Sequence, residues 1–228
     1  MKWRSVFLMI LSFNLVVQAQ SQVNQSLKKE LDSIYGEDQK YRELLFSDLL
    51  KTKADSIAAS YKVAKNELLN YLMQKMQVTD SLNLIRIQQL IQQYDYPGAS
   101  LVGSPANEAA FYVIQHSSKI DEFLPVIRNA AEKKELPFRL YAMMLDRSLM
   151  YKGEEQIYGT QGKGIEVFSK QTGKKEFKMI IWPVKDVENV NKRRKEAGFE
   201  STIEENAKRL GIDYKVLSLQ QVKEMTSN

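Results

Sequence analysis

The chain has 228 residues, of which 43% are hydrophobic, and a formal net charge of +5. This length allows one sizeable core with a helical extension, and the mild charge argues against a nucleic-acid-binding protein. The sequence contains one histidine and no cysteine, which excludes disulfides and thiol catalysis, and we expect neither a metal site nor a cofactor.

The first 19 residues have the layout of a secretory signal peptide. A basic start precedes an apolar run from Val6 to Val17, and Ala19 offers a small residue for cleavage. The run is shorter than the roughly 20 residues that cross a bilayer, so we expect cleavage after Ala19 rather than a membrane anchor. Export without cysteine suggests the periplasm or the exterior of a Gram-negative bacterium.

Helical periodicity begins at Leu27, with apolar residues at spacings of three and four. Gly36 is predicted to break this stretch, and the acidic residues after it are predicted to begin the next helix. A further helix is predicted to begin at Thr79 or Asp80. We therefore expect a helical extension over residues 20–78.

The predicted domain spans residues 79–212, and its first helix is followed by turns rich in Pro and Gly over residues 95–105. Three helices are predicted after these turns, over residues 106–117, over residues 120–134, and from Pro137 to a stop at Gly153.

After Gly153 the apolar residues alternate, so a β-hairpin is predicted over about residues 157–182. Helices are expected again over residues 186–197 and 202–210, and the tail, residues 213–228, fits no single pattern. The predicted fold class is mainly α: a helical domain with a small β-hairpin near its C-terminal third and an N-terminal helical extension.

Polar groups are concentrated where the helical period ends, in the segment Tyr158-Gly159-Thr160-Gln161. Gly159 permits a positive φ or a close approach of backbone, and Gln161 can donate and accept hydrogen bonds at once. The segment suits a sugar, peptide or amide ligand, and equally a structural polar network.

His116 ends the most apolar predicted helix and is a candidate general base, with Asp121 or Asp146 as the carboxylate that would fix its tautomer. The alternative is that His116 caps the helix by bonding its last carbonyl groups. A lone histidine is a weak catalytic signal, so the capping role is favoured.

Three arginines are candidates for binding an anion. Arg147 can bind a carboxylate or phosphate through two bonds, or it can form an internal ion pair. Arg193 and Arg194 project about 100° apart on a predicted helix, so only one of them is expected to face inward.

Together these residues resemble a bacterial family that is catalogued only as a domain of unknown function. The resemblance runs from Gly36 to Phe199 and rests on these elements: Asp38-Gln39 with Arg42, Tyr96-Pro97, Val102-Gly103, Gln115-His116, Asp146-Arg147, Tyr158-Gly159-Thr160-Gln161, and Val190 with Arg193-Arg194 and Gly198-Phe199. The family often has an acid two residues after the histidine, where this chain has Ser118. The resemblance implies no activity, but it implies one shared polar site made of His116, Asp146, Arg147, Tyr158, Thr160, Gln161, and Arg193 or Arg194.

The predicted function is that of an exported, non-enzymatic envelope protein that binds a polar or anionic ligand, such as a small molecule, glycan or peptide, or a protein partner. One alternative is a hydrolase of cell-wall or peptide material with His116 or Asp146 as general base. Another is that the polar residues only lock the hairpin to the helices. We expect no nucleic-acid partner and no transmembrane segment after signal cleavage, and the sequence indicates no oligomeric state.

Overall fold

The structure is a computed structural model, and it describes residues 23–169 and 172–226. The predicted signal peptide, residues 1–19, lies outside the described residues. The helices, in chain order, are α1 (Gln25–Phe46), α2 (Leu49–Tyr61), α3 (Leu68–Tyr94), α4 (Ala99–Val102), the 3-10 turn η1 (Ala106–Glu108), α5 (Ala109–Gln115), α6 (Ile120–Glu132), α7 (Phe138–Tyr151), the 3-10 turn η2 (Val187–Asn189), α8 (Val190–Glu196), α9 (Ile203–Arg209) and α10 (Leu219–Thr226).

A single antiparallel hairpin accompanies these helices in the described residues. Its strands are β1 (Gly162–Ser169) and β2 (Lys174–Ile181), paired from Gly162 with Ile181 to Ser169 with Lys174. The predicted fold class, mainly α with a small hairpin, is therefore confirmed. Within the described ranges, every helix is too short or too polar to cross a bilayer.

The N-terminal helices differ from the prediction because they are continuous. Helix α1 runs through Gly36, so the predicted break there is wrong. The buried side chains of Leu31, Ile34 and Tyr41 lie on one face of α1, and their packing outweighs the cost of about 1 kcal/mol that an interior glycine carries. Helix α3 likewise runs through positions 79–80, where a start was predicted, and the division of the chain near residue 78 stays a prediction.

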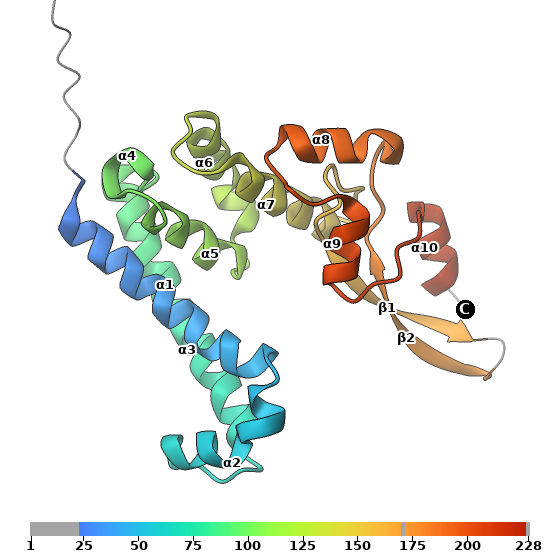
Figure 1. Cartoon of the computed structure of the whole chain (residues 1–228), viewed down its shortest axis with the longest axis horizontal. Helices are drawn as coiled ribbons and strands as arrows, with labels where there is room; N and C mark the ends of the chain where they lie inside the picture. The colour runs from blue at the N-terminus through green and yellow to red at the C-terminus, as the bar shows by residue number, and fades with distance from the viewer. Residues whose placement is uncertain (1–22, 170–171, 227–228) are drawn as a thin grey trace, which may run out of the picture.

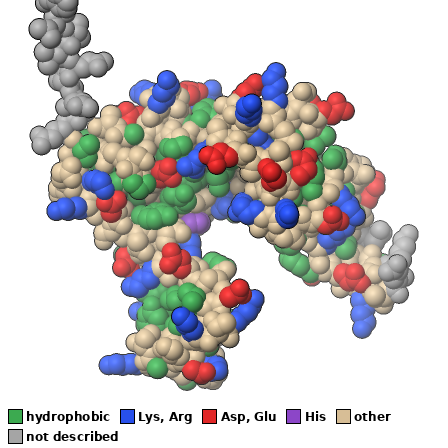
Figure 2. Space-filling model, in the orientation of Figure 1, with side chains coloured by type: hydrophobic (Ala, Val, Ile, Leu, Met, Phe, Trp, Pro, Cys, Tyr) green, Lys and Arg blue, Asp and Glu red, His purple; other side chains and the backbone are tan. Residues whose placement is uncertain are grey.

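Figure 1 shows α1 and α3 side by side, with α2 at their far end. Helix α7 connects this helical part to the hairpin and to α8, α9 and α10, which gather on the other side of the molecule. The space-filling view is hollowed between the arm that carries α2 and the C-terminal part (Figure 2).

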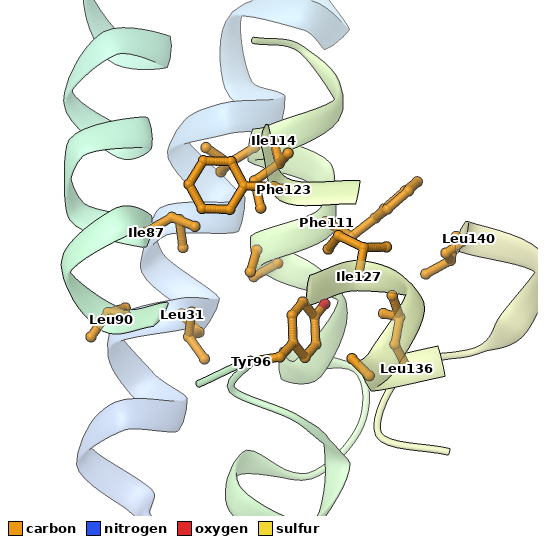
Figure 3. Packing of buried hydrophobic residues seen from close by; sticks show 14 of the residues in the cluster. Leu31, Ile87, Leu90, Tyr96, Phe111, Ile114, Phe123, Ile127, Leu136 and Leu140 are labelled. Atoms are coloured by element: carbon orange, nitrogen blue, oxygen red, sulfur yellow. The ribbon is translucent and has the colours of Figure 1, made fainter. Parts of the chain in front are cut away.

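The main core lies where α1 and α3 meet α5 and α6 (Figure 3). Leu31, Ile87, Ile114 and Ile127 are fully buried there, and each contributes about 1.5–3 kcal/mol through burial. A smaller cluster around Ile203 packs α9 against the end of β2, which fixes the C-terminal helices relative to the hairpin.

The three helices that were predicted to stop at a glycine do so, whereas α5 and α6 each end two residues before the predicted end. Gly153, Gly198 and Gly211 have positive φ and follow α7, α8 and α9, which is the conformation that a terminal glycine supplies. Thr202 caps α9 in a capping box with Glu205. The tail, which the sequence left open, contains α10, packed against β1.

Candidate functional site

The loop between α7 and β1 is built around the carboxylate of Asp146. One oxygen of Asp146 accepts hydrogen bonds from the backbone N–H groups of Ile157 (2.8 Å) and Tyr158 (3.0 Å). The other accepts from the backbone N–H and the hydroxyl of Thr160, both at 2.9 Å. Gly159, with φ of 64°, turns the chain so that these donors converge. Asp146 therefore fixes the shape of the loop.

The surroundings of Asp146 leave it no free lone pair for proton transfer. The residue is fully buried, and burial raises the pKa of its carboxyl, while the hydrogen bonds from Thr160, Tyr158 and Ile157 act in the opposite direction. Each oxygen of this buried carboxylate already accepts two hydrogen bonds, so the role of Asp146 is to hold the loop in place.

Gln156 ties the same loop to the hairpin. Its amide nitrogen donates to the carbonyls of Gln161 (3.0 Å) and Trp182 (2.8 Å), and its amide oxygen accepts from the N–H of Gln161 (2.7 Å). Gln156 is fully buried. Sequence reasoning did not assign it to the site, although it begins the polar segment.

Arg147 lies on α7 and contacts two neutral acceptors. Its Nε donates to the side-chain oxygen of Gln161 (3.1 Å), and one Nη donates to the carbonyl of Gln115 (3.0 Å). Among the described residues, no carboxylate lies within ion-pair distance of it. Burial lowers the pKa of the Arg147 guanidinium, which is the effect of desolvating a cation without a counter-charge.

His116 follows α5 and has a partner that sequence reasoning missed. Its Nδ1 lies 3.4 Å from an oxygen of Asp38, which is 1% exposed on α1. The same Asp38 oxygen accepts a bond from Gln39 (2.7 Å). The other Asp38 oxygen and the His116 Nδ1 are both buried without a hydrogen-bond partner. The His116 ring, purple in Figure 2, reaches the surface at the inner end of the hollow.

The two acids proposed for His116 have other partners. Asp121 accepts hydrogen bonds from the Ser148 hydroxyl and from Lys152 (2.9 Å), and Asp146 binds the loop. Asp38 could have been found from its position, because it continues the apolar spacing of α1 and a polar group on a buried stripe needs a partner.

Arg42 completes the contact between α1 and α3. Its guanidinium binds both oxygens of Asp80, at 2.9 and 2.8 Å, and also donates to the backbone carbonyl of Asp38 (2.8 Å). This bidentate pair positions Asp38, so Arg42 and Asp80 are positioning residues for the histidine pair. Sequence reasoning assigned neither of them to the site.

Arg193 and Arg194 hold the outer side of the loop. Arg193 donates to the carbonyl of Ile157 (3.1 Å) and pairs with Asp186 (2.8 Å). Arg194 is 2% exposed and donates to the carbonyl of Tyr158 (2.9 Å). The residue that faces inward is therefore Arg194.

The structure divides the predicted site residues into two groups. Arg147 and Gln161 of the first group share a hydrogen bond, and Arg147 also reaches the carbonyl of Gln115, which precedes His116 in the chain; we call His116, Arg147 and Gln161 the His–Arg cluster. Gln161 also donates to the hydroxyl of Thr160 (3.0 Å), so it connects the cluster to the second group. The other group holds the loop and consists of Asp146, Thr160, Arg193 and Arg194. The ring of Tyr158 lies beside that of Phe199, with 6.2 Å between the ring centres. Within the described ranges, no group of three or more His, Asp or Glu side chains is arranged to hold a metal ion.

Comparisons with known proteins identify a family and no activity. No curated protein and no solved structure matches the chain. One family model, described as a family of unknown function (DUF6624), matches residues 49–218. The match includes His116, Asp146, Arg147 and the loop, and it begins after Asp38. Because the match covers more than half of the sequence, the chain belongs to the DUF6624 family of unknown function.

Proposed function

We propose that the protein binds a small polar or anionic ligand at the His–Arg cluster. Arg147 carries this proposal, because it is a half-buried cation whose hydrogen bonds to described residues go only to neutral oxygens. Its second Nη donates to no described residue. A desolvated charge without a counter-charge is costly, and an oxyanion would accept charge-assisted bonds from the free edge of the guanidinium.

His116, which follows Gln115 in the chain, supports the same proposal. Its Nδ1 faces the buried Asp38, and its second ring nitrogen makes no hydrogen bond with the described residues. The ring is partly exposed at the hollow in Figure 2. A ligand there would meet an imidazole and a guanidinium that the fold already holds in place, which lowers the entropy cost of binding.

Isothermal titration calorimetry tests the proposal. The titrants are inorganic phosphate, envelope glycans and peptides, and the proteins are wild type, Arg147→Ala and the matched control Arg128→Ala. Arg128 is exposed on α6 and pairs with Glu132, so its loss should leave binding unchanged. We expect Arg147→Ala to weaken binding by about tenfold or more. Equal affinities in all three proteins, or no heat with any titrant, would refute the proposal.

A second candidate function is hydrolysis of peptide or cell-wall material. The 3.4 Å approach of His116 to Asp38 favours it, because a buried carboxylate beside Nδ1 orients an imidazole as a general base. The second ring nitrogen would take a proton from water as the oxygen adds to the substrate carbonyl, and would return that proton to the leaving group. Peptidoglycan-degrading activity that survives both His116→Ala and Asp38→Asn would eliminate this candidate.

We also propose that the chain is exported. The support is the sequence of residues 1–19, with its basic start, apolar run and Ala19. Amino-terminal sequencing of the protein purified from its natural host should find Gln20 as the first residue, and a retained Met1 would contradict export by cleavage.

A further inference from the structure

A second concavity, separate from the His–Arg cluster, lies between α5 and α7 on one side and α8 and α9 on the other. It has a volume of about 280 Å³, and neither His116 nor Arg147 lines it. Helix α7 lies between α5 and α9 in Figure 1, so this space runs along its flank. We call it the arginine cleft, because three arginines line it: Arg139, Arg194 and Arg209.

Arg194 places a fixed positive charge in the arginine cleft. Its guanidinium donates to the carbonyl (2.8 Å) and hydroxyl (3.0 Å) of Ser201 and to the carbonyl of Tyr158 (2.9 Å). In the described part of the chain, no carboxylate lies within ion-pair distance of the Arg194 guanidinium. Burial lowers the pKa of Arg194, as expected for a desolvated cation. The neutral acceptors orient the charge, and the acids that interact with it electrostatically, Asp146, Glu204 and Glu205, lie beyond ion-pair distance.

The other two arginines are more exposed than Arg194. Arg209 donates to the side-chain oxygen of Asn206 (2.8 Å), and no described acid forms an ion pair with it. Arg139 pairs with Glu108 at 3.3 Å. No acidic residue lines the arginine cleft itself. Among the described residues, Arg194 and Arg209 therefore form no ion pair, whereas Arg139 forms one.

The rest of the lining is apolar and aromatic. The ring of Phe199 stacks on Arg194, with its centre 4.6 Å from the guanidinium carbon. Met143 and Leu140 of α7 and Tyr112 of α5 supply further apolar surface. Such a lining suits a ligand in which an anionic group is attached to an apolar group.

We propose that the arginine cleft binds an organic phosphate, a phosphomonoester with an apolar organic group. A phosphomonoester carries about two negative charges at neutral pH, which matches the two arginines without a carboxylate partner. Its oxygens would accept bonds from the guanidinium of Arg209, and the buried Arg194 would balance the second negative charge. The organic group would pack against Phe199 and Met143.

Calorimetry of the purified full chain with four probes tests the chemistry: phenyl phosphate, inorganic phosphate, benzoate and phenol. Phenyl phosphate should bind about tenfold more tightly than each of the other three, because it alone combines a dianion with a ring. Equal affinity for benzoate would overturn the choice of a dianion. Equal affinity for inorganic phosphate would overturn the role of the ring. Equal affinity for phenol would overturn the role of the charge.

Three variants test the location. Arg209→Gln should weaken phenyl phosphate binding about tenfold, whereas Lys208→Gln should change it less than about twofold. Lys208 is the matched control, because it is an exposed neighbour that does not line the cleft. Arg147→Ala should leave phenyl phosphate affinity unchanged. Loss of binding in Arg147→Ala with full binding in Arg209→Gln would place the phosphate at the His–Arg cluster, overturning the cleft and leaving the proposed function intact.

Discussion

Replacing Asp146 with asparagine isolates the contribution of the carboxylate to the loop. The amide has nearly the same shape, but an NH₂ group, which donates hydrogen bonds, replaces one of the two carboxylate oxygens. Whichever way it turns, this NH₂ group faces two of the four donors from Ile157, Tyr158 and Thr160. If the NH₂ group faces Ile157 and Tyr158, both of their bonds are lost; if it faces Thr160, the bond from the backbone N–H is lost, whereas the hydroxyl can accept from the amide.

The magnitude follows from the bonds that are lost. A hydrogen bond to an ionised group contributes about 1.5–3 kcal/mol, so the loss of one or two of them amounts to roughly 1.5–6 kcal/mol. Asparagine also removes the cost of burying a charge, which offsets part of this loss. We expect Asp146→Asn to lower the free energy of unfolding by about 2–4 kcal/mol, and Tm by roughly 5–10 °C.

Urea denaturation followed by circular dichroism measures this change. Asp55→Asn is the matched control, because Asp55 is 80% exposed and pairs with Lys65 at the surface. Its free energy of unfolding should change by less than about 1 kcal/mol. If Asp146→Asn unfolds at the same urea concentration as Asp55→Asn, the carboxylate does not anchor the loop and the reasoning from its four bonds is refuted.

Three further predictions concern other contacts. Gly159→Ala should cost about 2 kcal/mol or more in urea denaturation, because its Cβ would lie 2.3 Å from an isoleucine side chain, whereas Gly173→Ala, with similar φ and open space, should cost less. Tyr96→Phe should cost about 1–2 kcal/mol, since the buried hydroxyl donates to a backbone carbonyl at 2.6 Å, and an unchanged Tm would contradict this. Hydrogen bonds from Ser148 and a lysine lower the pKa of Asp121 below its ordinary 3.8, so its ionised form stabilises the fold above that pH and the contribution is lost as the pH falls further. Asp121→Asn should therefore cost less than about 1 kcal/mol near pH 7 and nothing near pH 2, and a constant difference at both pH values would contradict the shift.

The fold could be predicted where local signals agree. Glycine stops and apolar periods place the helices after residue 106, and alternation places the hairpin. The prediction fails at Gly36 and at positions 79–80, because local signals there favour an end or a start. Packing between α1 and α3 decides both places, and this contact depends on residues that are distant in the sequence.

The site could be predicted in part, for a similar reason. The segment Tyr158-Gly159-Thr160-Gln161 is conspicuous because polar groups coincide with a change of period. The partner of His116 is not, because Asp38 comes from α1 and the sequence offers nearer acids. The N–H groups that donate to Asp146 follow it by more than ten residues, and the turn of the loop after α7 brings them next to it.

The peptide groups of the loop after α7 are oriented between charges of opposite sign. Its N–H groups point toward the acid Asp146 on one side, and its carbonyl oxygens point toward the bases Arg193 and Arg194 on the other. The peptide dipoles of the loop are therefore aligned between opposite charges. Reversing the sign at one end alone would set a charge against these dipoles, so the three positions are expected to change only in concert during evolution.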